Sequence, residues 1–170
     1  MKHLRYSLLL LLSIAFSNTS QAQSDPVLVN GINYELNEET KTASVTYGGD
    51  YVGDIVIPSS VNGYSVTSIG DHAFTGCNTM TSITMPNTIT SIGERAFGEC
   101  SGLTSITIPN SVTSIDRNVF MNCSGLTSIH IPDVVTSIGP SAFAYCSSLA
   151  SITIPDAVKS IGFGAFIVCI

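Results

Sequence analysis

The hydrophobic and polar positions of this chain repeat with a period of 23 residues. Cysteine marks the period most clearly, and phenylalanine, isoleucine and proline keep the same step. The recurring cysteines are Cys77, Cys100, Cys123, Cys146 and Cys169. The recurring phenylalanines are Phe74, Phe97, Phe120, Phe143 and Phe166. A fixed period in this range is typical of solenoid proteins, in which each repeat forms one coil and buries its apolar face against its neighbours.

Each repeat begins with a pattern that predicts a short β-strand. In the phrase LTSITIP, Ile106 and Ile108 alternate with Ser105 and Thr107, and β-branched residues dominate. The proline that follows cannot donate a ladder hydrogen bond, so it ends the strand. The next phrase, VTSIG, predicts a second short extended segment with its valine and isoleucine facing inward.

The last part of each repeat reads xxAFxxC, which is long enough for a single helical or 3₁₀ turn. The glycine that ends VTSIG predicts a positive φ where the chain turns, and Asp116 replaces it in one repeat. These glycines are Gly70, Gly93, Gly139 and Gly162. We therefore expect a β-rich repeat solenoid with short helical or 3₁₀ turns.

The two ends of the chain depart from the repeat. INYEL and TASVTY alternate well around the turn-like NEETK, which predicts an N-terminal β-hairpin that caps the first coil. We expect this β cap and a leading strand in residues 23–57, and the array of repeats in 58–170. Asn62 and Gly63 lie in an insertion and predict a small protruding turn.

The final repeat carries apolar residues where earlier repeats are polar or small, namely Phe163, Ile167 and Val168. A terminal repeat normally has a polar outer face. We therefore expect that the array is incomplete at its C-terminal end and that the chain is a fragment of a longer protein. The alternative is that this apolar end pairs with another surface.

Residues 1–22 have the pattern of a secretory signal peptide. Lys2 and Arg5 precede an apolar run, and Ser20 and Ala22 form a small-x-small cleavage site. A membrane anchor is less favoured, because the apolar run is much shorter than the ~20 residues that span a bilayer. We expect a secreted or cell-surface protein with no membrane insertion after cleavage.

Composition and motifs exclude several functional classes. The net charge is −6 and the basic residues do not cluster, so nucleic acid is not an expected partner. His72 and His130 are isolated, and no Gly-x-Ser-x-Gly elbow surrounds a serine. We therefore expect no catalytic residue and no cofactor, and the chain is not predicted to be an enzyme.

The cysteines of an exported protein suggest disulfides, but their regular step argues against them. Equivalent residues of stacked strands lie about 4.8 Å apart, whereas a disulfide needs Cβ atoms about 3.8 Å apart. A metal site is not expected either, because no C-x₂₋₄-C pair is present. A ladder of buried free thiols is favoured, with disulfides as the alternative.

The recurring LTSITIPxSVTSIGxxAFxxC resembles the BspA-like leucine-rich repeat family, also called the Treponema pallidum-type leucine-rich repeat, over about residues 52–170. Leu103, Ile106 and Ile108 fit the general LxxLxL strand of leucine-rich repeats. The resemblance implies a curved solenoid whose parallel sheet lines its concave side. Family members are commonly surface or secreted proteins of host-associated bacteria, and adhesion to host extracellular matrix proteins or to cells is the activity associated with them.

The outward strand positions form the candidate binding face. Its residues are Ser82, Thr84, Ser105, Thr107, Ser128, His130, Ser151 and Thr153. His130 interrupts the threonine pattern and is the best single candidate for a specific contact. A protein or glycoprotein ligand, such as a host matrix protein, is the expected partner. The alternatives are that these residues are ordinary solvated positions and that the protein is a structural or envelope-associated scaffold without a specific ligand.

Overall fold

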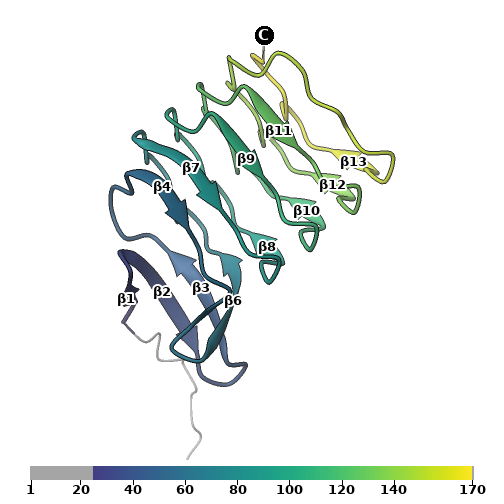
Figure 1. The fold of residues 1–170 in the computed structure, drawn as a ribbon. Coiled ribbons are helices and arrows are strands. Elements are labelled where there is room, and N and C mark those ends of the chain that lie inside the picture. Colours follow the sequence, from purple (N-terminus) through teal and green to yellow (C-terminus); the bar gives the residue numbers. More distant parts are fainter. Residues whose placement is uncertain (1–24, 170) are drawn as a thin grey trace, which may run out of the picture.

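The computed structural model describes residues 25–169, which form a stack of coils with a small sheet at its N-terminal end (Figure 1). The predicted signal peptide lies outside the described residues. Each coil contributes strands to two sides of the stack and a run of turns to a third side. This is the repeat solenoid that the 23-residue period predicted.

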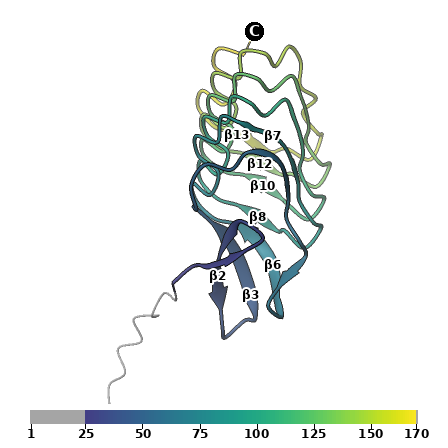
Figure 2. The same cartoon turned by 60° about the vertical axis from the view of Figure 1, so that its left-hand side comes forward.

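The sheet at the N-terminal end contains the predicted hairpin. Its strands are β1 (Val27–Val29), β2 (Ile32–Asn37), β3 (Thr42–Thr46), β5 (Ser60–Val61) and β6 (Tyr64–Ile69). The order is β1-β2-β3-β6-β5, and β3 pairs in parallel with β6 of the first coil. The hairpin therefore covers the free edge of the first coil by extending its sheet (Figure 2). The predicted protruding turn is confirmed, because Asn62 and Gly63 join β5 to β6 with positive φ angles.

One side of the array carries four strands, of which the last three have outward serine, threonine or histidine residues. These strands are β4 (Gly53–Val56), β7 (Met80–Thr84), β9 (Ser105–Thr107) and β11 (Ser128–His130). β4 pairs in parallel with β7, and β9 pairs in parallel with β11. Ser105 lies opposite Ser128, so equivalent positions of successive repeats are neighbours in space.

The second side carries β6 and four two-residue strands. These are β8 (Ser91–Ile92), β10 (Ser114–Ile115), β12 (Ser137–Ile138) and β13 (Ser160–Ile161). β6 pairs with β8, and β10, β12 and β13 form a parallel ladder. Within residues 25–169, no strand pairing joins β8 to β10.

The third side, here called the turn face, comprises residues 71–77 and their equivalents in later coils. The predicted helical turn is not present, and residues 25–169 contain no helix, hence none suited to crossing a membrane. Alternate amides of this face donate along the stack: Phe74 N bonds to Ala96 O at 2.8 Å, and Phe97 N to Val119 O at 2.9 Å. Because these donors point to the next coil, they cannot make the i→i−4 bonds of an α-helix.

The turn face also needs left-handed backbone at two positions in each coil. In the coil that contains Phe97, Arg95 and Glu99 have φ angles of 54° and 64°. The equivalent residues of other coils are of unrelated types, including His72 and Tyr145. A left-handed residue interrupts a right-handed helix, which is a second reason why the segment forms turns.

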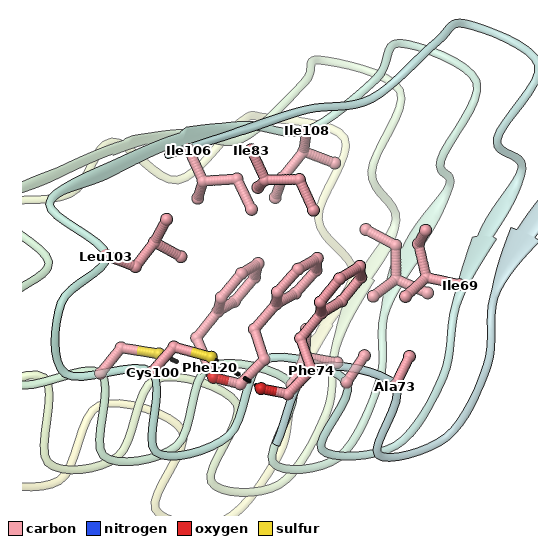
Figure 3. Packing of buried hydrophobic residues seen from close by; sticks show 14 of the residues in the cluster. Ile69, Ala73, Phe74, Ile83, Cys100, Leu103, Ile106, Ile108 and Phe120 are labelled. Carbon is pink, nitrogen blue, oxygen red and sulfur yellow. Dashed lines mark hydrogen bonds between the residues drawn. The ribbon is translucent and has the colours of Figure 1, made fainter. Parts of the chain in front are cut away.

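A row of phenylalanine rings fills the centre of the stack (Figure 3). Successive rings of the recurring phenylalanines lie 5.3–5.5 Å apart, with interplanar angles of 2–12°. Tyr51 packs on Phe74 at 4.9 Å and closes the row at its N-terminal end. The strand isoleucines cover the rings from above, and each buried aromatic side chain contributes about 1.5–3 kcal/mol of burial free energy.

The cysteines hold neighbouring coils together without forming disulfides. All five are free thiols, as the repeat spacing predicted. The Cys100 thiol donates to Phe74 O at 3.0 Å, and the Cys123 thiol donates to Phe97 O at 3.0 Å. Cys146 and Cys169 repeat this bond at 3.1 Å to the phenylalanine carbonyl of the coil before. The cysteines are therefore structural.

The glycines that end VTSIG have a different role from the one predicted. None of the four has a positive φ. Instead, a Cβ added to Gly139 would lie 2.7 Å from Arg117 N, and one added to Gly162 would lie 2.3 Å from Pro140 N. Real Cβ atoms do not approach backbone this closely, so glycine is required because neighbouring coils touch here.

Asp116 occupies the glycine position in one coil, and the ladder is interrupted there. Gly93 N bonds to Ile69 O at 2.8 Å, and Gly139 N bonds to Ile115 O at 2.7 Å. The amide of Asp116 makes no equivalent bond in the described part of the chain. We attribute the gap between β8 and β10 to Asp116, because a residue with a Cβ does not permit the close approach between coils that glycine permits.

Gly139→Ala should destabilise the protein by about 1–3 kcal/mol, because its Cβ would force two coils apart. Asp116→Ala is the matched control: a Cβ is already accommodated at this position, so the expected change is within about 0.5 kcal/mol. Urea unfolding followed by circular dichroism measures both. Equal free energies of unfolding for the two variants would contradict the close-contact explanation.

Candidate binding face

The eight candidate residues lie on the side of β4, β7, β9 and β11, here called the hydroxyl face. Ser105 pairs with Ser128 and Thr107 pairs with His130 across β9 and β11. Ser151 and Thr153 follow one coil later, in a segment without assigned strand structure. All eight are exposed except Ser82, which is half-buried. Alternation along the strands thus placed these residues on one surface.

Two shallow grooves cross the hydroxyl face. The larger has a volume of about 330 Å³ and includes Asp133 among its lining residues. Five candidate residues also line it: Ser105, Thr107, Ser128, His130 and Thr153. The smaller groove, of about 250 Å³, brings Thr84 and Thr107 beside Asn87 and Asn110. Ser82 and Ser151 line neither groove.

Ser82 is engaged within the protein. Its hydroxyl donates to Asp54 Oδ1 at 2.7 Å, and the Thr81 hydroxyl donates to the same oxygen at 2.8 Å. These two hydrogen bonds, the Ser82 bond foremost, hold the pKa of Asp54 below its usual value. The other seven candidate side chains make no hydrogen bond within residues 25–169, so their polar groups are available to a ligand.

Some hydroxyl groups elsewhere in the array have structural partners. Thr88 Oγ1 donates to Val66 O at 2.6 Å, and Thr127 Oγ1 donates to Thr104 O at 3.1 Å. Both bonds join one coil to the coil before it. Thr88 and Thr127 therefore represent a structural class that is bonded to backbone, whereas Thr84, Thr107 and Thr153 on the hydroxyl face belong to an unpaired class.

A further row of polar side chains borders the hydroxyl face and was not singled out from the sequence. It comprises the residues that follow the recurring proline: Asn87, Asn110, Asp133 and Asp156. All four are exposed, and three of them line the grooves. The step of 23 residues was the available signal. We call these four residues the post-proline row.

The buried cysteine thiols are the other candidates for chemistry in the described part of the chain. Burial raises the pKa of Cys100 and of Cys146 to about 12, and it raises the pKa of Cys123 well above its usual value, so these thiols are protonated at neutral pH and are poor nucleophiles. No group of three or more histidine, cysteine, aspartate or glutamate residues lies together within residues 25–169 as a metal site.

The end of the last described coil is apolar, as the sequence indicated. Phe163 is 91% exposed, and Ile161, Ile167 and Val168 are also exposed. This surface lies on the final coil and is distinct from the two grooves of the hydroxyl face.

Replacing one threonine of each class should separate the two roles. Thr88→Val removes a bond to the backbone carbonyl of Val66 and should lower the free energy of unfolding by about 1 kcal/mol. Thr107→Val removes a hydroxyl without an internal partner and should leave stability unchanged within about 0.5 kcal/mol. Chemical denaturation tests the pair, and a larger loss from Thr107→Val would contradict the division.

Solved structures share this fold. The chain is 30% identical to a leucine-rich repeat protein of T. pallidum, with a TM-score of 0.76, and the match covers 83% of this chain and 66% of that protein. It is 38% identical to a leucine-rich repeat protein of Bacteroides ovatus, with a TM-score of 0.76. This second match covers 82% of this chain and 38% of the B. ovatus protein. A leucine-rich cell surface protein of Faecalibacterium prausnitzii is 28% identical, with a TM-score of 0.51 and coverage of 85% and 52%.

The chain thus spans about two thirds of the T. pallidum protein and less than half of the B. ovatus protein. No curated protein matches it. The family profile of the BspA type leucine-rich repeat region matches residues 44–170 in six copies. The family profile, the 23-residue period, the stacked coils and these relatives agree, and the chain belongs to the BspA-type leucine-rich repeat family.

Proposed function

We propose that this chain is a secreted or cell-surface protein that binds another protein or a glycoprotein through its hydroxyl face and catalyses no reaction. One observation carries the proposal. Seven exposed polar side chains lie together on one face that two grooves cross, and none of the seven has a hydrogen-bond partner within residues 25–169. Leucine-rich repeats are a protein-interaction architecture, which fits an unpaired polar surface of this kind.

Two further observations support an exported location. The first 22 residues have the pattern of a signal peptide. The F. prausnitzii relative is described as a cell surface protein. A protein displayed outside the cell would meet host matrix proteins and glycoproteins, which are therefore the first ligands to test.

The chemistry of the face favours binding over catalysis. Its only imidazole, that of His130, lies opposite Thr107, with no hydrogen-bonded carboxylate in the described residues. A general base needs an acidic or basic partner that orients it and tunes its pKa. The face also lacks the large aromatic and arginine anchors that dominate interface energies, so each contact should be weak and gain strength from many copies.

Solid-phase binding of the purified chain to fibronectin, fibrinogen and mucin, with albumin as the reference, tests this function. The variant Ser105→Glu/Thr107→Glu/Ser128→Glu places three carboxylates on the hydroxyl face. It should reduce saturable binding at least tenfold, because ligand groups would have to displace or desolvate these charges.

A matched control carries the same three added charges on other parts of the surface. Thr113→Glu, Ser147→Glu and Ser148→Glu replace exposed residues that line neither groove. This control should bind like the parent chain. Equal binding by both variants, or no signal above albumin on any surface, would contradict the proposed function and favour a scaffold without a specific ligand.

A further inference from the structure

The post-proline row changes from amide to carboxylate along the stack. Its first two members are Asn87 and Asn110, and its last two are Asp133 and Asp156. The last two coils are in register, because Ser137 pairs with Ser160 exactly one repeat later. Equivalent side chains of these coils are close: the rings of Phe143 and Phe166 are 5.4 Å apart. Two carboxylates therefore stand one coil apart at one end of the hydroxyl face.

One of these carboxylates lines the larger groove, and the other belongs to the residue that follows one of its lining residues. Asp133 lines it directly, and so does Pro155, the residue before Asp156. The same groove contains Ser128 and His130, whose polar side chains have no partner in the described residues. The groove thus combines hydroxyl and imidazole hydrogen-bonding groups with carboxylates at its edge.

Neither carboxylate has a cationic partner within residues 25–169. This part of the chain has four lysine and arginine residues, and three of them form ion pairs with glutamates. These ion pairs are Lys41 with Glu38, Arg95 with Glu99, and Arg117 with Glu94. The fourth, Lys159, directly precedes β13 on the other strand side and lines neither groove. The groove edge therefore carries uncompensated negative charge.

Two carboxylates at this spacing suit one particular kind of ligand group. Like charges one coil apart repel each other, and a cation placed between them relieves the repulsion. A metal ion is not indicated, because no cluster of three or more candidate ligands occurs in the described residues. An arginine guanidinium, or a lysine ammonium, can bond to both carboxylates at once.

We propose that the larger groove of the hydroxyl face receives an arginine- or lysine-bearing segment of a partner protein. Asp133 and Asp156 contact its cationic group, and Ser128 and His130 bond to its neighbouring polar groups. This inference rests on the proposed function, since it names the chemistry of the partner at the same face.

The probe is a ten-residue peptide in which arginine alternates with serine, titrated into the purified full chain by calorimetry. A peptide with glutamine in place of arginine is the uncharged comparison. The test variant is Asp133→Asn/Asp156→Asn, which installs the side chain that Asn87 and Asn110 already provide at equivalent positions. The control variant, Asp50→Asn/Asp116→Asn, has the same net charge and changes exposed residues away from the groove.

The arginine peptide should bind the parent chain, and the glutamine peptide should not. The test variant should bind the arginine peptide about fivefold to tenfold more weakly, as expected for two exposed ion pairs, and the control variant should change the affinity less than twofold. Equal weakening by both variants would show that only net charge matters and would overturn the inference. Unchanged affinity in the test variant, or no peptide binding, would overturn it as well.

The matrix proteins separate this inference from the proposed function. If Asp133→Asn/Asp156→Asn keeps full binding to a matrix protein while the triple glutamate variant loses it, the cationic segment is wrong and the hydroxyl face still binds. If Asp133→Asn/Asp156→Asn and the triple glutamate variant both lose that binding, and the control variant of each keeps it, the inference and the proposed function stand together.

Discussion

Hydrogen bonding between equivalent backbone positions of successive coils is the interaction on which the rest of the structure depends. On the turn face, alternate amides donate to the next coil, as Phe120 N does to Ala142 O at 2.8 Å. The carbonyl of Phe120 then accepts the amide of Cys123 at 3.2 Å and the thiol of Cys146 at 3.1 Å. No coil can satisfy these groups alone, so each requires its neighbours, and this explains why the same side chains return in every repeat.

The same constraint separates structure from binding. Phenylalanine, cysteine and isoleucine face the interior, glycine allows neighbouring coils to touch, and the ladder itself uses backbone atoms. Apart from Ser82 and Thr81, which bond to Asp54, the side chains of the outward strand positions and of the post-proline row make no hydrogen bond between coils in the described residues, so they can vary at little cost to the stack. His130 in place of threonine, and Asp133 in place of asparagine, are changes of this kind. Different residues on the hydroxyl face can therefore give different binding specificities without changing how the coils pack.

The 23-residue period was enough to predict the solenoid, and side-chain alternation was enough to predict the capping hairpin and the outward strand positions. The turn face was not predictable in the same way. Phe74 and Cys77 have a spacing that also suits a helical turn, and left-handed residues as unlike as His72 and Tyr145 leave no local signal. A glycine at position 139 is compatible with a positive φ or with a close approach between coils, and only the position of the neighbouring coil shows that the second reason applies. The strand β1 was missed although Asn30–Gly31 is a turn signal, and Asp133 was missed because it lies beside the strands.

Amide hydrogen exchange, followed residue by residue by NMR on the full chain, tests the ladder between coils most directly. The amides of Phe97 and Phe120, which donate to the next coil, should exchange only through global unfolding, whereas the unpaired amide of Asp116 should exchange rapidly in the same sample. Exchange of the Phe97 and Phe120 amides at the rate of the Asp116 amide would contradict the account, because it would show that these turns are not bonded from coil to coil.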